Sequence, residues 1–182
     1  YFSECFKKNP EHGYTVNFIC DNNGFTLYDL VSYDRKHNEE NGENNRDGRD
    51  YNNSWNCGEE GATKNRKILI QRLRNRKNAM CFVLLSQGIP MIYAGDEFGN
   101  SQNGNNNAYC QDNETGWVDW SALKKNRNFY NFICGLINFR HSHKVLHIEK
   151  ELVQSDYKYF GLPDISYHGS KAWYPEMEHY NR

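Results

Sequence analysis

The stretch LSQGIPMIYAGDEFG, residues 85–99, decides the fold of this chain. Its middle, residues 88–93, is a short apolar run that predicts a buried β-strand, and Pro90 lies near the start of the run, where a missing N–H is tolerated. The run leads into the acidic pair Asp96 and Glu97. An earlier run, residues 16–20, has the same form and leads into DNNG at residues 21–24, a turn signal. Both patterns indicate a strand that ends in a polar turn.

A polar loop and then a helix are expected after the first strand. Residues 33–61 form a long segment rich in Asn, Gly and charge, and Thr63 is expected to cap a helix over residues 64–86. One face of that helix is expected to carry Leu69, Leu73, Met80 and Leu84. The basic residues 72–77 are interpreted as its solvated face rather than as a phosphate-binding patch.

The second strand is followed by the same succession. A polar loop over residues 99–115 leads to a helix that Ser121 is expected to cap and that reaches His141. Its apolar face has helical spacing and comprises Phe129, Phe132, Ile133, Leu136, Ile137 and the stem of Arg140. The repeated order of strand, loop and helix predicts two β/α units of a parallel architecture. Functional side chains in such folds gather at the C-terminal ends of the strands.

Composition favours one domain with long loops, or a piece whose missing core lies elsewhere. Of the 182 residues, 37% are hydrophobic and 15% aromatic, and the mean hydropathy is -0.97. The net charge of -1 indicates neither nucleic acid nor an anionic membrane as a partner. No apolar run is long enough to span a membrane, and no signal-peptide pattern opens the chain. The start at Tyr1 rather than Met indicates missing upstream sequence.

The six cysteines favour a reducing, cytoplasmic compartment. None is spaced as CxxC, so the sequence does not indicate a zinc site. Cys81 and Cys134 lie in helical apolar runs and are expected to be buried free thiols. The even count leaves disulfides open as an alternative.

Several blocks, taken together and in order, resemble the glycogen-debranching and isoamylase branch of the α-amylase superfamily. They are residues 17–27, 30–38, 41–48, 54–58, 85–99, 104–113 and 117–120. The resemblance implies that residues 1–143 are part of a (β/α)8 catalytic barrel, comprising its last two strands and helices. Residues 144–182 would then be a linker and the start of a C-terminal β-sandwich domain. The implied activity is hydrolysis of α-1,6 branch linkages in glycogen or starch, with an α-glucan as the partner and no cofactor.

The resemblance also implies which catalytic residues this chain lacks. Enzymes of this branch use an Asp nucleophile and a Glu acid/base from mid-barrel strands, and no segment here corresponds to those strands. A third carboxylate belongs to a His-Asp pair directly before Gly-Phe-Thr-Leu, where this sequence has Asn22 and Asn23. Asn22 could still bond a sugar hydroxyl, whereas Asn23 carries no charge to stabilise an oxocarbenium ion. The isolated chain is therefore expected to be inactive.

Substrate contacts are expected mainly in the second polar loop. Its clustered amides offer both donors and acceptors, and an aromatic side chain can cover an apolar sugar face. With the resemblance, the predicted substrate-binding residues are Asn22, Trp55, Asn107, Tyr109 and Asp112, beside Asn23 at the substituted catalytic position. Trp117 and Trp120 are expected to pack against the last helix, and His141 and His143 to be surface residues near its end.

Three other acidic patterns are candidate sites. Asp21 could act as a displaced carboxylate, but the favoured interpretation is a hydrogen-bonded strand-end residue. The pair Asp96 and Glu97 is expected to be structural, because adjacent side chains on an extended chain point apart. Residues 43–48 resemble half of an EF-hand loop, yet its twelfth position would be Ser54, so a polar lid loop is predicted and no metal.

Two further hypotheses stand beside the hydrolase fragment. The substituted pair Asn22 and Asn23 favours a catalytically silent α-glucan-binding or regulatory protein. A decayed or truncated product without function is the third. Because two β/α units leave apolar surface uncovered, the isolated chain is also expected to associate or to be loosely packed.

Overall fold

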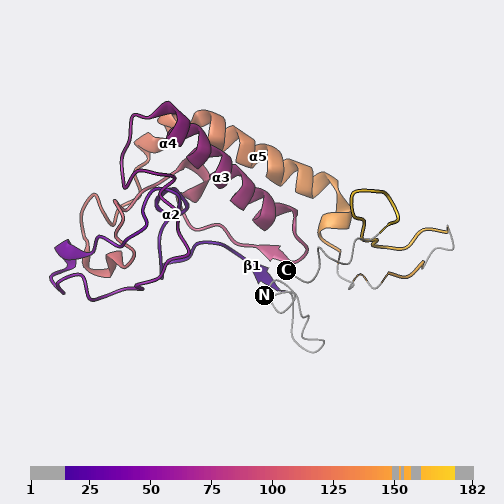
Figure 1. The fold of residues 1–182 in the computed structure, drawn as a ribbon, viewed down its shortest axis with the longest axis horizontal. Helices are drawn as coiled ribbons and strands as arrows, with labels where there is room; N and C mark the ends of the chain where they lie inside the picture. The colour runs from indigo at the N-terminus through magenta and orange to yellow at the C-terminus, as the bar shows by residue number, and fades with distance from the viewer. Residues whose placement is uncertain (1–14, 149–151, 153, 157–160, 175–182) are drawn as a thin grey trace. The chain divides into compact units, whose positions relative to one another are not determined.

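The computed structural model describes residues 15–148, 152, 154–156 and 161–174 (Figure 1). The chain falls into two units, Tyr1–His147 and Ile148–Arg182. In the second unit, an isolated antiparallel bridge pairs Lys171 with Tyr174. The expected start of a β-sandwich stays a prediction, because residues 149–151, 153, 157–160 and 175–182 lie outside the described part.

Two short parallel strands form the sheet of the first unit. β1 (Val16–Asn17) pairs with β2 (Ile89–Pro90), with Val16 opposite Ile89. The amide of Ile89 donates to Thr15 O at 2.8 Å, and that of Met91 donates to Asn17 O at 2.9 Å. Since the ladder uses the N–H groups on either side of Pro90, its missing donor costs no bond. The predicted parallel pair is confirmed, but each strand is shorter than the apolar run that indicated it.

Four α-helices and four 3-10 turns complete the described residues. The α-helices are α2 (Leu27–Leu30), α3 (Arg66–Leu85), α4 (Ser121–Lys125) and α5 (Arg127–Ser142). The 3-10 turns are η1 (Glu39–Asn41), η2 (Asp96–Phe98), η3 (Ala108–Cys110) and η4 (Lys144–Leu146). The long helices α3 and α5 lie side by side (Figure 1). The structure is thus a mixed α/β fold with long connecting loops.

The core lies between these helices and the segment that follows β1. It consists of Cys20, Leu27, Met80, Leu84, Phe129 and Ile133, with Leu73, Phe132, Leu136 and Ile137 packed against it. The predicted apolar face of α5 is therefore confirmed. The predicted face of α3 is wrong at Leu69, which is exposed, while Met80 and Leu84 are buried as expected.

Both predicted helix caps are wrong. Helix α3 starts at Arg66. The side chain of the preceding residue, Asn65, caps the helix by accepting from Lys67 N at 3.1 Å. Thr63 instead accepts from the amide of Asn65. Ser121 is the first residue of α4, and its amide donates to the Asp119 carboxylate at 2.8 Å. The single helix expected to reach His141 is divided at Asn126 into α4 and α5.

The basic residues of α3 do not all face solvent, which corrects the sequence interpretation. Arg72 and Arg76 are buried. Arg72 donates to Gly61 O at 2.6 Å and to Asn56 O at 2.9 Å, both in the long loop that covers the helix. The guanidinium of Arg76 lies over the rings of Tyr28 and Phe129, at 5.0 and 4.8 Å from their centroids.

Trp117 and Trp120 do not pack against the last helix as expected. They are 57% and 70% exposed, and Trp120 contacts Phe98 instead, with ring centroids 5.4 Å apart. Cys81 and Cys134, expected to be buried, are half-buried and free. His141 and His143 are exposed at the end of α5, as predicted.

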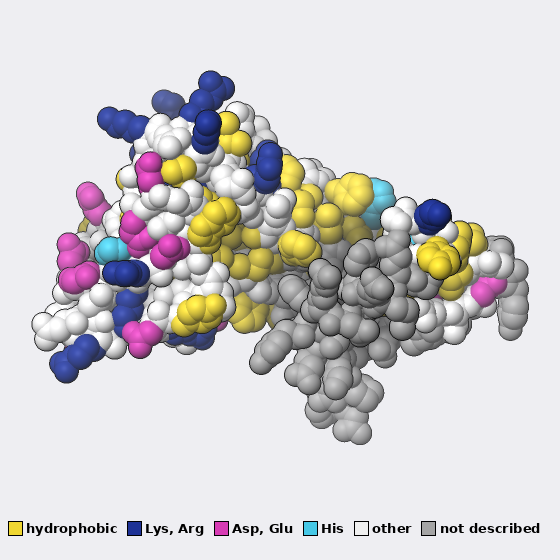
Figure 2. Space-filling model, in the orientation of Figure 1, with side chains coloured by type: hydrophobic (Ala, Val, Ile, Leu, Met, Phe, Trp, Pro, Cys, Tyr) yellow, Lys and Arg dark blue, Asp and Glu magenta, His cyan; other side chains and the backbone are white. Residues whose placement is uncertain are grey.

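Exposed apolar side chains remain on this unit. They occur beside the sheet, at Val16, Phe18, Ile19, Ile89 and Met91, and on the long helices, at Ile70, Phe82 and Phe139. Figure 2 shows hydrophobic side chains gathered among polar ones over the helical region. Among the described residues, no helix is both long and apolar enough to cross a membrane. The exposed apolar surface agrees with the expectation of association, which stays a prediction.

Arg140 joins α5 to the end of α3, and its replacement should lower stability. The buried guanidinium donates to three carbonyl oxygens, those of Leu84 at 2.9 Å, Ser86 at 2.7 Å and Gly88 at 2.5 Å. Arg140→Met keeps the apolar stem but leaves these acceptors unpaired, so we expect a loss of about 1–3 kcal/mol in the free energy of unfolding. Urea unfolding at matched protein concentration measures the loss. The exposed neighbour provides the control, since His141→Ala should stay within about 0.5 kcal/mol; equal effects of the two changes would contradict the anchoring role.

Candidate functional site

The segments after the two strands meet through a buried carboxylate. Asp96, in η2, is 3% exposed, and its Oδ1 accepts from the amide of Leu27 at 2.7 Å. Burial raises the pKa of Asp96 to about 7. Glu97 points elsewhere and accepts from Gly95 N at 2.9 Å. The structural role predicted for this acidic pair fits these bonds, because both carboxylates hold backbone amides.

A small cavity of about 200 Å³ opens where β1 ends. The strand-end segment lines one side, with Asp21, Asn23 and Phe25 among its residues. Loop residues line the other side, namely Arg49, Tyr51, Asn52 and Asn53. We call this cavity the strand-end pocket. Its walls present amides, a guanidinium and an aromatic ring, which are groups that suit a polyhydroxylated ligand.

Asn23 sits at the rim of this pocket in a tight turn. Its amide N–H donates to the Asp21 carboxylate at 2.8 Å, and its side chain is exposed. Asp21 therefore has the hydrogen-bonded role that was the favoured interpretation. Asn22, which precedes Asn23 in the turn, is also exposed but does not line the strand-end pocket.

A pair of buried asparagines holds the two long loops together. Asn38 donates from Nδ2 to Asn106 Oδ1 at 2.9 Å, and its own Oδ1 accepts from Asn106 N at 3.0 Å. The Nδ2 of Asn106 then donates to Arg49 O at 2.8 Å and to Asn52 Oδ1 at 2.7 Å. Both asparagines are buried. The second loop thus fixes the position of the residues that line the strand-end pocket.

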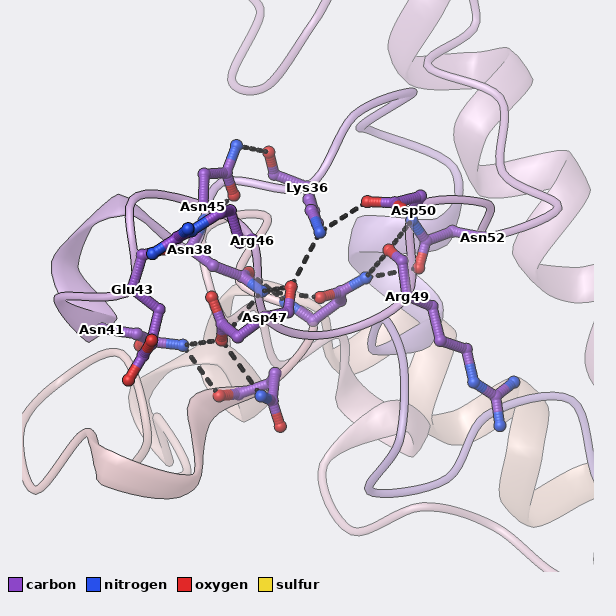
Figure 3. A network of polar contacts seen from close by, with 12 residues as sticks. Lys36, Asn38, Asn41, Glu43, Asn45, Arg46, Asp47, Arg49, Asp50 and Asn52 are labelled. Carbon is purple, nitrogen blue, oxygen red and sulfur yellow. Dashed lines mark hydrogen bonds and ion pairs between the residues drawn. The ribbon is translucent and has the colours of Figure 1, made fainter.

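Asp47 lies at the centre of the same amide network (Figure 3). Its Oδ2 accepts from Asn41 Nδ2 at 2.7 Å and from Asn107 Nδ2 at 3.0 Å, and these bonds lower the pKa of Asp47. Lys36 donates to Asp47 O at 2.8 Å and pairs with the Asp50 carboxylate at 2.6 Å. Segment 43–48 is thus bonded to the protein's own side chains. Among the described residues, no group of three or more His, Cys, Asp or Glu could hold a metal ion.

Gly48 shows how closely the two loops approach. Its φ of +70° is left-handed, and a Cβ there would lie 2.2 Å from Asn106 Oδ1 and 2.7 Å from Asn38 Nδ2. Only glycine fits without displacing the asparagine pair. The tight packing of this loop explains why a polar, Asn-rich segment has a defined conformation.

The six predicted site residues do not all meet in the strand-end pocket. Of them, only Asn23 lines it. Trp55 is exposed on the first loop, and its amide donates to Leu30 O at 3.0 Å. The Asn107 amide is engaged by Asp47, and Asp112 accepts from the indole of Trp117 at 3.0 Å. Tyr109 is 70% exposed. Their roles in substrate binding stay predictions.

Sequence reasoning missed the pocket residues supplied by the first loop. Arg49, Tyr51, Asn52 and Asn53 line the strand-end pocket, and Tyr51 is 78% exposed. The available signal was their position, directly after the block 41–48 that carries the family resemblance. Their position next to that block in the sequence predicts that they lie near the site. Where they line the pocket depends on the Asn38 and Asn106 pair, which the sequence does not reveal.

Comparisons with known proteins agree with the resemblance. No family model matches the chain. A glycogen operon protein GlgX homolog of Mycobacterium tuberculosis is 53% identical over 131 residues, which are 72% of this chain and 18% of the relative. Isoamylase 1 of Arabidopsis thaliana, a chloroplastic protein, is 44% identical over 149 residues, which cover 76% of this chain and 19% of the relative. The chain thus spans about a fifth of the length of these relatives.

A solved structure shares the fold. A pullulanase mutant from Paenibacillus barengoltzii, complexed with maltotetraose, matches with a TM-score of 0.53 and 24% identity, over 73% of this chain and 16% of that chain. The mixed α/β fold thus matches part of a pullulanase, and the sequence matches part of the GlgX and isoamylase proteins. The sequence of the chain is a partial match to the GlgX and isoamylase proteins and corresponds to a section of them.

Asp96 should make the stability of the fold depend on pH. Its pKa rises from an ordinary 3.8 to about 7 in the folded chain, so the folded state binds the proton more tightly than the unfolded state does. This contribution is fully present below about pH 4 and is lost as the pH rises through about 7, with a slope of at most about 1.4 kcal/mol per pH unit. Burial also raises the pKa of Asp29 to about 6, which adds to the slope in the lower half of that range.

The variant Asp96→Asn tests this assignment, because its side-chain oxygen can still accept from Leu27 N but cannot ionise. We expect urea unfolding across a pH series to show a flatter profile between about pH 4 and 7 for the variant. Asp112→Asn, at an exposed carboxylate, is the control and should keep the original profile. An unchanged slope in Asp96→Asn would rule out Asp96 as the source.

Proposed function

We propose that this chain is a section of a debranching glycoside hydrolase that acts on α-1,6 branch linkages of glycogen or starch. In this proposal residues 1–143 supply the last two β/α units of a (β/α)8 barrel, and residues 144–182 a linker and the start of a β domain. The parallel pairing of β1 with β2 supports the barrel assignment, as does the match of several blocks to GlgX and isoamylase proteins. The remaining strands would come from sequence outside these residues.

One observation carries the proposal, the strand-end pocket with Asn23 at its rim. The pocket lies where β1 ends, at the edge of a parallel sheet where barrel enzymes bind substrates. Amide groups can donate to and accept from sugar hydroxyls, and the exposed Tyr51 ring can contact an apolar sugar face. In this proposal Asn22, Trp55, Asn107, Tyr109 and Asp112 extend the α-glucan-binding wall around Asn23.

The catalytic consequence of Asn23 is a missing charge. In the retaining two-carboxylate mechanism, positive charge develops on the sugar ring and is stabilised by nearby carboxylates. An amide at residue 23 can hydrogen-bond the sugar but cannot supply that charge. The nucleophile and the acid/base would also have to come from other segments. We therefore propose that the isolated chain is inactive and that Asn23 slows any longer protein that contains it.

A second candidate is a catalytically silent α-glucan-binding or regulatory protein. The observation that favours it is the same Asn22 and Asn23 pair, which removes the His-Asp pair that the family resemblance leads one to expect. We also propose a reducing, cytoplasmic location, which the five free cysteines among the described residues support.

Restoring the carboxylate separates the two candidates. In a protein that joins this chain to intact Asp and Glu motifs, Asn23→Asp should raise kcat on a branched dextrin by up to ~10²–10³, the usual effect of one preorganised stabiliser. KM should change much less, because the added charge acts chiefly on the transition state. Asn22→His should act mainly on KM. Steady-state kinetics with reducing-sugar release measures both.

Two controls make this result specific. Asn78→Asp adds a charge at an exposed position of α3 that lines neither cavity, and it should leave kcat unchanged. The isolated 182-residue chain should release no reducing sugar from pullulan or amylopectin with either residue at position 23. If kcat is unchanged for Asn23→Asp and for the double variant with Asn22→His, the hydrolase proposal fails and the silent binder becomes the better one.

A further inference from the structure

A second, larger groove lies apart from the strand-end pocket. Its volume is about 750 Å³, within the roughly 300–1,000 Å³ of small-molecule sites. Tyr28 and Tyr33 line it from the segment around α2, and Trp117 and Trp120 line it from the segment before α4. The two cavities have no lining residue in common. We call it the tryptophan groove.

Both indoles are held in place while much of each side chain stays exposed. The Trp117 N–H donates to the Asp112 carboxylate at 3.0 Å, so its polar atom is satisfied and its orientation fixed. The Trp120 ring contacts the buried ring of Phe98. Their exposed fractions are 57% and 70%. A fixed but exposed aromatic surface loses little side-chain entropy when a ligand covers it.

Polar groups of both kinds surround the aromatic side chains. Asp119 lies between the tryptophans in sequence, and its amide donates to Asn100 Oδ1 at 2.8 Å, which fixes the backbone there. Lys125 approaches the Asp119 carboxylate at 3.9 Å, and both side chains are largely exposed. Such an exposed pair is weak and leaves the Lys125 ammonium and Asp119 Oδ2 available to a ligand, while Asp119 Oδ1 accepts from Ser121 N. Ser101 and Asn103 add a hydroxyl and an amide to the lining.

We propose that the tryptophan groove is a second binding site for an α-glucan chain. Sugar rings have apolar faces bordered by hydroxyl groups, which matches aromatic side chains bordered by amides, hydroxyls and charges. A purely apolar partner would leave Asp119 and Lys125 desolvated, which is costly. The choice of an α-glucan rests on the proposed function, whereas the existence of a saccharide site rests on the groove itself. The site would hold the polymer while a branch point reaches the strand-end pocket.

Binding of maltoheptaose by the 182-residue chain tests the proposal. The single replacements Trp120→Ala and Trp117→Ala should each raise the dissociation constant for maltoheptaose roughly tenfold, as measured by titration calorimetry. In the original chain, maltoheptaose should also protect part of the tryptophan fluorescence from quenching by iodide, and that protection should fall in Trp120→Ala. Both side chains are exposed, so far-ultraviolet circular dichroism and the urea-unfolding midpoint should show that the fold survives.

Control variants separate this site from the strand-end pocket. Trp173→Ala removes an indole of similar exposure, 60%, that lines neither cavity, and it should leave binding unchanged. Tyr51→Ala changes the strand-end pocket alone. Binding that is lost in Tyr51→Ala but unaltered in both groove variants overturns the tryptophan groove and leaves the proposed function standing. If the original chain does not bind maltoheptaose, both the tryptophan groove and the proposed glucan-binding wall are overturned. The hydrolase proposal is tested separately, by the effect of Asn23→Asp on kcat.

Discussion

The carboxylate of Asp29 is completely buried, and it accepts a hydrogen bond from the Ser101 hydroxyl at 2.6 Å and another from Gln102 N at 2.7 Å. A buried carboxylate without such partners would be costly, so these bonds define how the segment after β1 meets the segment after β2. Asp96 makes the converse connection by accepting from Leu27 N. Between them, the two acids join α2 to the second loop, which in turn carries Asn106. The position of the strand-end pocket follows from this arrangement, because Asn106 holds its loop residues.

The site therefore depends on side-chain amides more than on regular secondary structure. The sheet has only two residues in each strand, and the residues of the strand-end pocket lie on loops and turns outside α3 and α5. Amides can satisfy these loops because each offers both a donor and an acceptor, and the Asn38 and Asn106 pair uses both. A network of this kind is stabilising only while every member is satisfied. In the proposed function the same type of side chain would also meet the sugar.

The parts of the fold with local signals could be predicted from the sequence, and the parts decided by distant contacts could not. Apolar spacing predicted the core face of α5, and two apolar runs predicted parallel strands. Thr63 and Asn65 can both cap a helix, and only the backbone geometry selects Asn65. Arg72 was assigned to solvent because its partners, Gly61 O and Asn56 O, belong to a loop without periodicity. At the site, turn chemistry placed Asn23 at a strand end, but nothing local indicates that Asn106 bonds Asn38, 68 residues away.

The turn at Asn23 has a consequence for the chemical lifetime of the protein. Asn23 is exposed and precedes Gly24, which has no side chain to hinder attack of its backbone nitrogen on the Asn23 side-chain carbonyl carbon. That attack expels ammonia and forms a cyclic imide, which water opens to aspartate or isoaspartate. Asn41 and Asn103 also precede glycines. The Gly42 amide is engaged by Glu39 O and the Asn41 side chain by Asp47, whereas the Gly104 amide is engaged by the Asp29 carboxylate. Ageing by deamidation should thus begin at residue 23, and old preparations will carry a carboxylate where the gene encodes an amide.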